Sequence, residues 1–352
     1  MTEPEGRLPF IFLHVAVTAR EEKTSSAGMI QPRSCLRFVQ TVHRRVAAAV
    51  SLALLLASFP QLLAQTPAAS QGAGSLNFLV ISDWGGKGGK AQVAVGGAMG
   101  RIAEAQKSRF VVTCGDNYHG SGIDSAASPR WKTEYEDIYT GPSLQVPWYP
   151  SLGNHDNRGK ADAEIEYSQL SSRWKFPARY YAHCEKIDDQ TEALFVHLDT
   201  SPFVAAYRKK GSSYKVQDQD PKAQLRWLEA ALSESTARWK IVVGHHPIYS
   251  SAPMHGDTKE LIADVLPILQ KHGVRLYFCG HDHVLEYLVH GDLNCFVCGG
   301  GSSHRSVAER ADVRFSAASA GFLAMTLSAT GAEAGFFNEK GKELYLAKIP
   351  AP

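Results

Sequence analysis

Net charge is almost absent from this sequence of 352 residues. Its 37 lysine and arginine residues and 35 aspartate and glutamate residues leave a formal charge of +2, and the two signs are interspersed along the chain. A chain without a strong field of one sign has no general attraction for nucleic acid or for an anionic membrane. We therefore expect no nucleic-acid binding, and the partners have to be inferred from a local site.

Phosphate-cradling loop motifs are missing as well. Gly85, Gly86, Gly88 and Gly89 follow the first apolar run, but the sequence there has neither a Gly-Lys-Ser/Thr ending nor a Gly-x-Gly-x-x-Gly pattern. Those two patterns are the ones with which backbone amides bind nucleotide phosphates. The glycines instead favour a close approach of the backbone to a site of another kind.

Cysteine is scarce, with six residues in the whole chain. Cys295 and Cys298 form one Cys-x-x-Cys pair inside an apolar run, and no second pair stands at zinc-finger spacing. Cys114 and Cys279 end two other apolar runs, where a small buried thiol is the ordinary interpretation. The cysteines therefore do not favour a structural zinc site.

The first 74 residues differ in composition from the rest. Arg44 and Arg45 precede an apolar stretch over 46–57, and small residues follow over 64–69. A basic region, an apolar stretch and a small-residue exit are typical of a secretory signal peptide, and the stretch is too short to span a bilayer comfortably. We predict a signal peptide and linker over residues 1–74, with Met29 as a candidate start. The mature protein would be secreted or periplasmic without a stable membrane span; retention as an anchor is the alternative.

Residues 75–352 are predicted to form one catalytic domain. Apolar residues make up 44% of the chain, which is enough to bury a substantial core, and no internal repeat divides it. Strand-like runs alternate with helix-like segments, among them Pro221–Ser233 and a segment from Asp257, its predicted cap, to His272. This alternation by itself favours a single doubly wound sheet.

Five apolar runs end in aspartate, asparagine or histidine. Ligand groups gather beyond the carboxyl ends of strands in α/β architectures, and these side chains are ligands of first-row divalent metals. The residues at the five run ends are Asp83, Asp116, Asn154 with His155, His245 with His246, and His281 with His283. The pattern predicts a site for two metal ions. Asp199 ends a further run, where a hydrogen-bonding role is favoured over a ligand role.

The same blocks resemble the calcineurin-like metallophosphoesterases and, more narrowly, the small tartrate-resistant type of purple acid phosphatase. The resemblance covers nearly all of 75–350. It rests, in order, on Asp83-x-Gly85, Gly115-Asp116, Gly153-Asn154-His155-Asp156, Val242-x-x-His245 and Gly280-His281-x-His283. It implies an α/β (α+β) fold in which two mixed β-sheets pack as a sandwich flanked by helices, with the metals at the strand ends.

The resemblance also implies a role for each site residue. Hydroxide bridging two metal ions would attack phosphorus, with phosphate monoesters as substrates. The implied assignments are Asp83 and His283 for the first metal, Asn154, His245 and His281 for the second, Asp116 as the bridge, and His155 for the phosphoryl oxygens or the leaving group. His255 matches a second substrate-facing histidine, although its loop is one residue longer than in the family. His246 is interpreted as a neighbour of the ligands.

One position departs from the family pattern. Purple acid phosphatases have Gly-Asp-x-x-Tyr, whose tyrosinate binds ferric iron, whereas the alignment without gaps places His119 there and leaves Tyr118 one residue too early. We predict His119 as the ligand, with Tyr118 or neither residue as the alternatives. A neutral imidazole in place of a phenolate removes support for Fe(III), so a divalent pair of Fe, Mn or Zn is favoured. The prediction is a colourless enzyme with an optimum closer to neutral pH.

Three functions remain open at this point. The leading one is hydrolysis of phosphate monoesters, with a phosphorylated small molecule or phosphoprotein as substrate. A phosphodiesterase or nucleotidase is the first alternative, because the same metals serve both reactions and specificity would lie in loops such as Ser201–Gln219 and Ser250–Thr258. A non-catalytic binding scaffold is the second, and the intact set of ligand residues argues against it. The sequence leaves the oligomeric state open.

Overall fold

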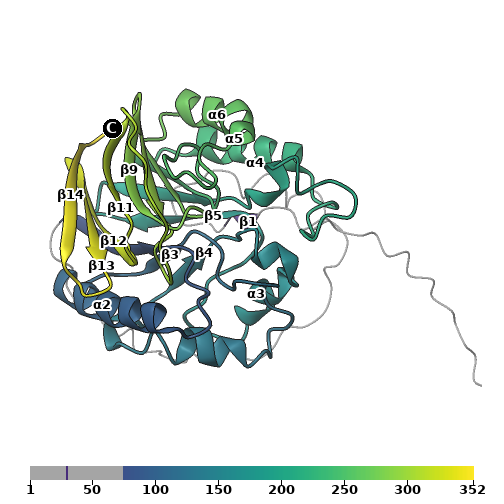
Figure 1. Cartoon of the computed structure of the whole chain (residues 1–352). Helices are drawn as coiled ribbons and strands as arrows, with labels where there is room; N and C mark the ends of the chain where they lie inside the picture. Colours follow the sequence, from purple (N-terminus) through teal and green to yellow (C-terminus); the bar gives the residue numbers. More distant parts are fainter. Residues whose placement is uncertain (1–28, 31–73) are drawn as a thin grey trace, which may run out of the picture.

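The computed structural model describes residues 29–30 and 74–352, and within them two mixed β-sheets face each other (Figure 1). The predicted signal peptide lies almost entirely outside the described residues. The larger sheet has eight strands, in the order β1 (Met29–Ile30), β5 (Tyr181–Lys186), β6 (Glu192–His197), β7 (Trp239–Val243), β8 (Leu276–Cys279), β10 (Leu293–Cys298), β9 (Leu285–His290) and β11 (Val313–Ala317). The smaller has six, in the order β14 (Glu343–Pro350), β13 (Gly331–Asn338), β12 (Gly321–Ser328), β2 (Ser75–Ile81), β3 (Val111–Thr113) and β4 (Trp148–Pro150).

Parallel strands form one half of the smaller sheet and the middle of the larger one. In the smaller sheet β2, β3 and β4 run parallel to one another, and in the larger sheet β6, β7 and β8 do the same. The strand residues are nearly all buried, as expected for strands covered on both faces. Because parallel strands end at a common edge, the loops after β2, β3, β4, β7 and β8 gather on one rim of the sandwich.

Aromatic and aliphatic side chains fill the space between the two sheets. Leu76, Phe78 and Val80 alternate along β2 and point to this layer, where the ring of Phe78 meets the rings of Phe195 at 5.3 Å and Phe278 at 6.1 Å. The sandwich implied by the resemblance is therefore confirmed. The single doubly wound sheet predicted from alternation is wrong, because β12 pairs with β2 and brings the C-terminal strands into a separate sheet.

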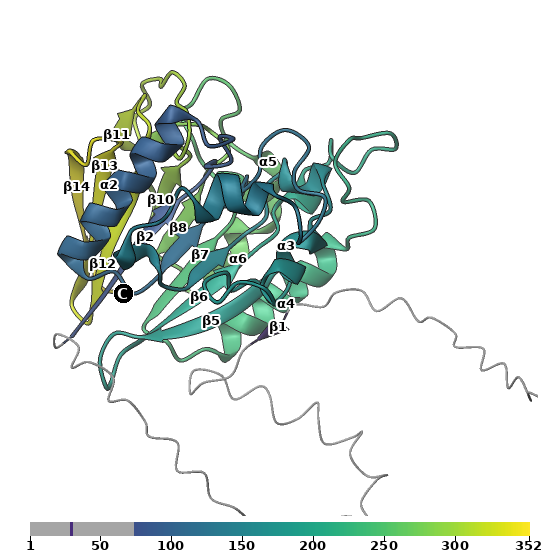
Figure 2. The ribbon, with the colours of Figure 1, turned by 90° about the horizontal axis from the view of Figure 1, so that it is seen from below.

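Helices cover the outer faces of both sheets (Figure 2). α2 (Lys90–Gln106) packs Val95 and Met99 against the outer side of β2. α4 (Pro221–Glu234), α5 (Lys259–Asp264) and α6 (Leu266–Lys271) pack on the outer side of the larger sheet, and α3 (Asp162–Tyr167) is a short helix beside the rim. The remaining helical elements are single turns, namely η2 (Lys132–Glu136), η3 (Pro142–Leu144), η4 (Asp156–Arg158) and η5 (Ser201–Phe203).

The helix predicted from Asp257 to His272 is two helices, and the predicted cap is wrong. Pro267 has no amide hydrogen and its ring cannot follow an unbroken helical turn, so α5 ends before it and α6 begins at Leu266. Thr258 occupies the N-cap position. Asp257 accepts a hydrogen bond from the amide of Ser250 at 3.0 Å and forms an ion pair with Arg310.

Two buried histidines of the larger sheet make stability depend on pH. The rings of His183 and His197 lie 5.3 Å apart on β5 and β6, and neither ring nitrogen of His183 has a hydrogen-bond partner among the described residues. Burial lowers the pKa of His183 to about 3. Burial, followed by the charge of His183, holds the pKa of His197 well below its usual value.

We expect the free energy of unfolding to fall as the pH drops below about 6.5, because the unfolded histidines then bind protons that the folded ones exclude. His183 alone should cost about 2 kcal/mol at pH 5. The substitution His183→Phe, which keeps the stacking on Tyr149, should reduce this loss in denaturant titrations at pH 7.5 and pH 5. The exposed His290→Phe is the control, and an equal acid loss in wild type and His183→Phe would contradict the assignment.

Candidate metal centre

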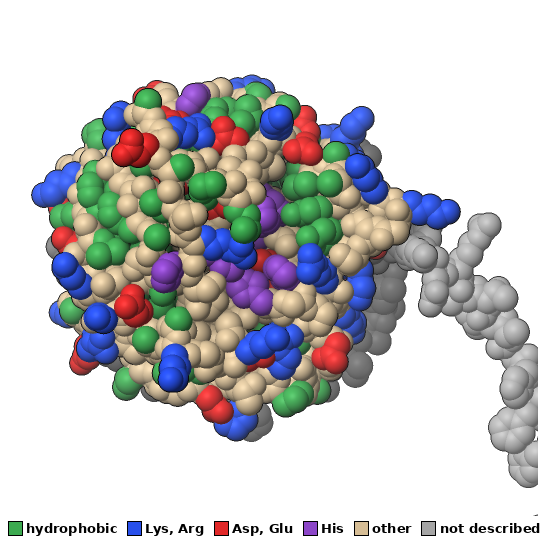
Figure 3. Space-filling view, in the orientation of Figure 1, with side chains coloured by type: hydrophobic (Ala, Val, Ile, Leu, Met, Phe, Trp, Pro, Cys, Tyr) green, Lys and Arg blue, Asp and Glu red, His purple; other side chains and the backbone are tan. Residues whose placement is uncertain are grey.

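The predicted residues meet on one rim of the sandwich. Asp83 follows β2, Asp116 follows β3, Asn154 follows β4, and the loops after β7 and β8 bring His245 and His281 with His283. Histidine side chains gather near the middle of the face seen in Figure 3, with acidic and basic side chains beside them. Loops that are far apart in sequence thus converge because the parallel strands before them end together.

The backbone is strained at three of these positions. Asp83, Asp116 and His281 have φ angles of 56°, 47° and 68°, in the left-handed region that L-residues rarely adopt. Such conformations cost free energy and cluster at functional sites. Gly153 lies so close to Asp116 that a Cβ atom there would collide with its amide and carboxylate. The left-handed backbone and the close approach of Gly153 together direct the side chains of Asp83, Asp116 and His281 toward the same site.

Asp83, His119 and His283 form the first group of donors. The Oδ1 atom of Asp83 lies 3.3 Å from Nε2 of His283 and 3.8 Å from Nε2 of His119. Nδ1 of His119 is 3.1 Å from the carbonyl oxygen of Gly85, which has to accept its hydrogen, so Nε2 carries the free lone pair. Oδ1 of Asp83 and Nε2 of His119 are buried, and neither has a hydrogen-bond partner within the described part of the chain. A cation would satisfy both atoms.

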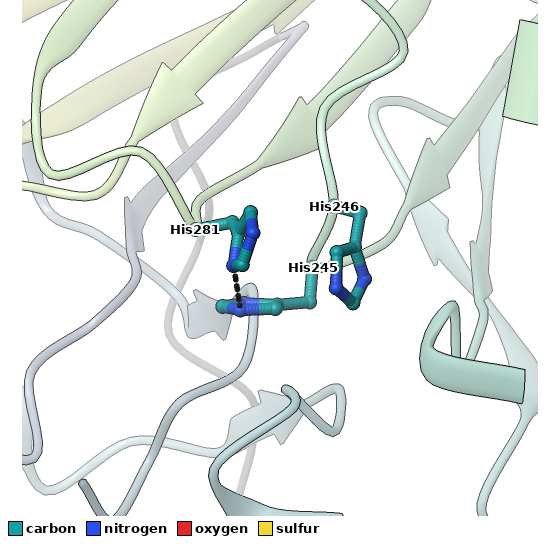
Figure 4. A group of neighbouring side chains, drawn as sticks. All are labelled: His245, His246 and His281. Atoms are coloured by element: carbon teal, nitrogen blue, oxygen red, sulfur yellow. Dashed lines mark hydrogen bonds between the residues drawn. The ribbon is translucent and has the colours of Figure 1, made fainter. Parts of the chain in front are cut away.

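Asn154, His245 and His281 form the second group. Nδ1 of His245 donates to the carbonyl oxygen of Cys114 at 2.9 Å, so its Nε2 holds a lone pair, 3.0 Å from Oδ1 of Asn154. Nδ1 of His281 lies 3.3 Å from the same Nε2, as the dashed line in Figure 4 shows. Two imidazole nitrogens and an amide oxygen turned toward one another are suited to a metal ion between them.

Asp116 lies between the two groups. Its Oδ1 is 3.4 Å from Nε2 of His245 in the second group, and its Oδ2 is 3.6 Å from Nε2 of His119 in the first. The amide of His155 donates to Oδ1 at 2.8 Å, which fixes the carboxylate. The position is the one required of a ligand shared by two ions, and the donor set fits a dinuclear centre.

His246 is close to this centre but has no lone pair to offer a metal. Its backbone amide and that of His245 both donate to Oγ1 of Thr200, at 3.0 Å and 3.2 Å. The hydroxyl of Thr200 therefore has to give its one hydrogen to Nδ1 of His246, which lies 2.8 Å away. A neutral imidazole that accepts at Nδ1 carries its hydrogen on Nε2. Figure 4 shows the ring of His246 beside the rings of His245 and His281.

The structure separates the two candidates for the position of the family tyrosine. His119 points to Asp83 and Asp116, as described above. Tyr118 is fully buried on the other side of the loop, where its ring packs on Trp131 at 4.9 Å and Trp84 at 5.7 Å. Burial raises the pKa of Tyr118 well above its ordinary value, so its phenol stays protonated. The geometry therefore places the imidazole at the site and the phenol in the core.

His155 and His255 lie at the mouth of the site. Nδ1 of His155 is held by the carbonyl oxygen of Gly120 at 2.8 Å, and its Nε2 lies 4.0 Å from Oδ2 of Asp116. The ring of His255 is exposed and lies 4.1 Å from the ring of His281. Asp199 accepts hydrogen bonds from the amide of Ser201 and the side chain of Asn157, which matches the hydrogen-bonding role predicted for it.

Sequence reasoning missed a set of residues that hold the ligands in place. The hydroxyl of Ser302 donates to the carbonyl oxygen of Asp83 at 2.6 Å, and that of Ser303 lies 2.6 Å from Nδ1 of His283. The amide of Arg305 donates to the carbonyl oxygen of His283 at 2.8 Å. The signal in the sequence is the glycine run before them, since a Cβ at Gly301 would collide with Ser82.

Comparison with known proteins identifies the class to which this fold and site belong. The calcineurin-like phosphoesterase family matches residues 76–285, so the chain belongs to that family. Purple acid phosphatase 17 of Arabidopsis thaliana is 37% identical over 330 residues, covering 85% of this chain and 94% of its own length. Tartrate-resistant acid phosphatase type 5 of Mus musculus is 34% identical over 231 residues, covering 61% of this chain and 68% of its own. The chain is a member of the purple acid phosphatases, as the resemblance predicted.

Solved structures show the same fold. GAP50, the anchor in the inner membrane complex of Plasmodium, superimposes with a TM-score of 0.71 at 27% identity, covering 79% of this chain and 90% of its own. Purple acid phosphatase PPD1 of yellow lupin superimposes with a TM-score of 0.57 at 15% identity, covering 79% and 54%. Within residues 29–30 and 74–352, no helix combines the length and apolar character needed to cross a membrane.

Proposed function

We propose that the protein is an exported, dinuclear metal-dependent phosphatase that hydrolyses phosphate monoesters. The observation that carries the proposal is the position of Asp116, whose two carboxylate oxygens face two separate groups of donors at 3.4 Å and 3.6 Å. Two cations held about 3.5–4 Å apart would polarise a phosphoryl group and acidify a water molecule between them. The substrate would be a phosphorylated small molecule or a phosphoprotein.

Two histidines of the chain would position the phosphate ester and protonate its leaving group. His155 is the best placed, because the carbonyl oxygen of Gly120 fixes its ring at Nδ1 and its Nε2 lies 4.0 Å from Oδ2 of Asp116, on a side chain that is 27% exposed. That nitrogen can hold a phosphoryl oxygen or, when protonated, give its hydrogen to the leaving alkoxide. His255 stands on the exposed edge beside His281, where it would contact the part of the substrate that departs.

The first donor group favours divalent metals. With His119 in place of a tyrosinate, its only anions are the carboxylates of Asp83 and Asp116, so a ferric ion has less charge compensation than a divalent one. We infer a pair drawn from Fe(II), Mn and Zn. Export rests on the basic and apolar pattern over 44–57, which lies outside the described residues.

A scaffold without activity is the second candidate, because the structure also resembles an anchor protein, GAP50. The two functions differ in what the donor atoms do. A scaffold does not need aspartates with a strained backbone. It also does not need buried metal-ligand atoms that lack a hydrogen-bond partner among the described residues, such as Oδ1 of Asp83 and Nε2 of His119. Both features favour the enzyme.

Metal removal tests the proposal. We expect the purified protein to release p-nitrophenol from its phosphate monoester. Chelation should remove at least 90% of this activity (roughly tenfold), because the reaction depends on the bound metal ions. Addition of Mn or Zn should restore the activity. The bis-ester, assayed in parallel, should be a poorer substrate. Faster turnover of the bis-ester would indicate a phosphodiesterase. No turnover of either ester with any metal would support the scaffold.

A further inference from the structure

Tyr207 places a hydroxyl group beside His246, next to the metal centre, from a loop whose sequence has no regular pattern. The loop follows η5 and is tied to the rim by the amide of Lys215, which donates to the carbonyl oxygen of Asn157 at 2.7 Å. The phenol oxygen of Tyr207 lies 3.3 Å from Nε2 of His246, and the ring of His246 lies 4.5 Å from that of His281. Tyr207 thus stands one side chain away from a predicted metal ligand.

The direction of the hydrogen bonds leaves the hydrogen of Tyr207 available. Thr200 gives its only hydrogen to Nδ1 of His246, so Nε2 of His246 is a donor and the phenol oxygen of Tyr207 accepts from it. The phenol therefore has its own hydrogen to donate elsewhere. Burial and nearby charges, Asp116 among them, raise the pKa of Tyr207, so the hydroxyl keeps this hydrogen at neutral pH.

The surroundings hold the Tyr207 ring in one orientation. Tyr214 packs on it with ring centroids 3.9 Å apart, and Nη2 of Arg158 donates to the hydroxyl of Tyr214 at 2.7 Å. The guanidinium of Arg158 also lies over the ring of Tyr214, at 4.6 Å. An anionic phosphoryl oxygen is a stronger hydrogen-bond acceptor than a phenol, so it would take the hydrogen of Tyr207 in preference to the hydroxyl of Tyr214.

We propose that Tyr207 is a further substrate-contacting residue, which donates its hydroxyl hydrogen to a phosphoryl oxygen of the ester bound at the metal centre. The inference rests on the proposed phosphatase function and adds to it a residue that the strand-end motifs do not contain. His246 and Thr200 would act as positioning residues, because they fix the direction of the donor without touching the substrate.

The test compares the variants Tyr207→Phe and Tyr214→Phe, each of which removes one hydroxyl from the same stacked pair. We expect Tyr207→Phe to lower kcat/KM for p-nitrophenyl phosphate roughly tenfold and to raise the inhibition constant of inorganic phosphate by a similar factor, since one hydrogen bond to a charged oxygen is lost. Bound metal and thermal midpoint should equal those of wild type. Tyr214→Phe should change both constants less than threefold.

The outcomes separate this inference from the function on which it rests. An inactive wild-type protein would refute the phosphatase itself. An active wild type with an unchanged Tyr207→Phe would refute only the role of Tyr207. Equal losses in the two variants would also overturn it, because they would show that the packing of the loop and not the Tyr207 hydroxyl affects the substrate. Lower metal content in Tyr207→Phe would assign Tyr207 to metal retention instead.

Discussion

The variant Asp116→Asn is expected to lose phosphatase activity by a factor on the order of 10³ or more. The two carboxylate oxygens of Asp116 face His245 and His119, one in each donor group, so neutralising Asp116 removes an anionic ligand from two ions at once. Asparagine keeps the shape, tolerates the left-handed backbone with φ of 47°, and can still accept the hydrogen bond from the amide of His155. The fold should therefore persist.

Three measurements check this expectation together. Metal analysis of Asp116→Asn should show fewer than two ions per chain. Its circular dichroism spectrum should equal that of the wild type, whereas its kcat for p-nitrophenyl phosphate should fall by the factor given above. The exposed Asp124→Asn, in the same loop region, makes the same change of charge and should behave as wild type. Full activity in Asp116→Asn would contradict the shared-ligand role.

The variant His119→Tyr is expected to turn a colourless protein purple when it is loaded with iron in air. The imidazole of His119 faces Asp83 and Asp116, so a phenolate in its place would supply the anionic oxygen that stabilises Fe(III). The side chain of His119 is 17% exposed, which leaves room toward solvent for the longer tyrosine. The wild type should lack an intense visible band and work best closer to neutral pH.

The control for colour is His119→Phe, which has the aromatic ring without the phenol oxygen. Loaded with iron in the same way, it should stay colourless, so that a band in His119→Tyr can be assigned to phenolate-to-iron charge transfer. A purple wild type with an acid optimum would contradict the divalent pair. It would also require a phenolate from elsewhere, since Tyr118 is buried among tryptophans.

Most of the metal donors could be predicted from the sequence because they stand where an apolar strand stops, whereas His119 was predicted from the resemblance to the family pattern. Asp83, Asp116 and His281 follow strands whose side chains are almost all buried, and a polar residue at that place has few structural reasons to be there. The sandwich could not be predicted in the same way. The pairing of β12 with β2 joins segments at opposite ends of the domain, and periodicity contains no information about strand partners.

Residues outside the strand ends were missed for a different physical reason. Tyr207 and Ser303 lie in loops, where the chain follows no period of 2 or 3.6 residues that would predict which way a side chain points. Their positions depend on long-range contacts, such as that between Tyr207 and His246. The single helix predicted over 257–272 is wrong for a local reason, because Pro267 divides the segment into α5 and α6.

The most direct test of the dinuclear centre is anomalous diffraction from crystals of the protein grown with manganese. We expect two peaks about 3.5–4 Å apart. One should be surrounded by Asp83, His119 and His283, the other by Asn154, His245 and His281, and both should contact Asp116. A single peak, or none among these side chains, would contradict the account.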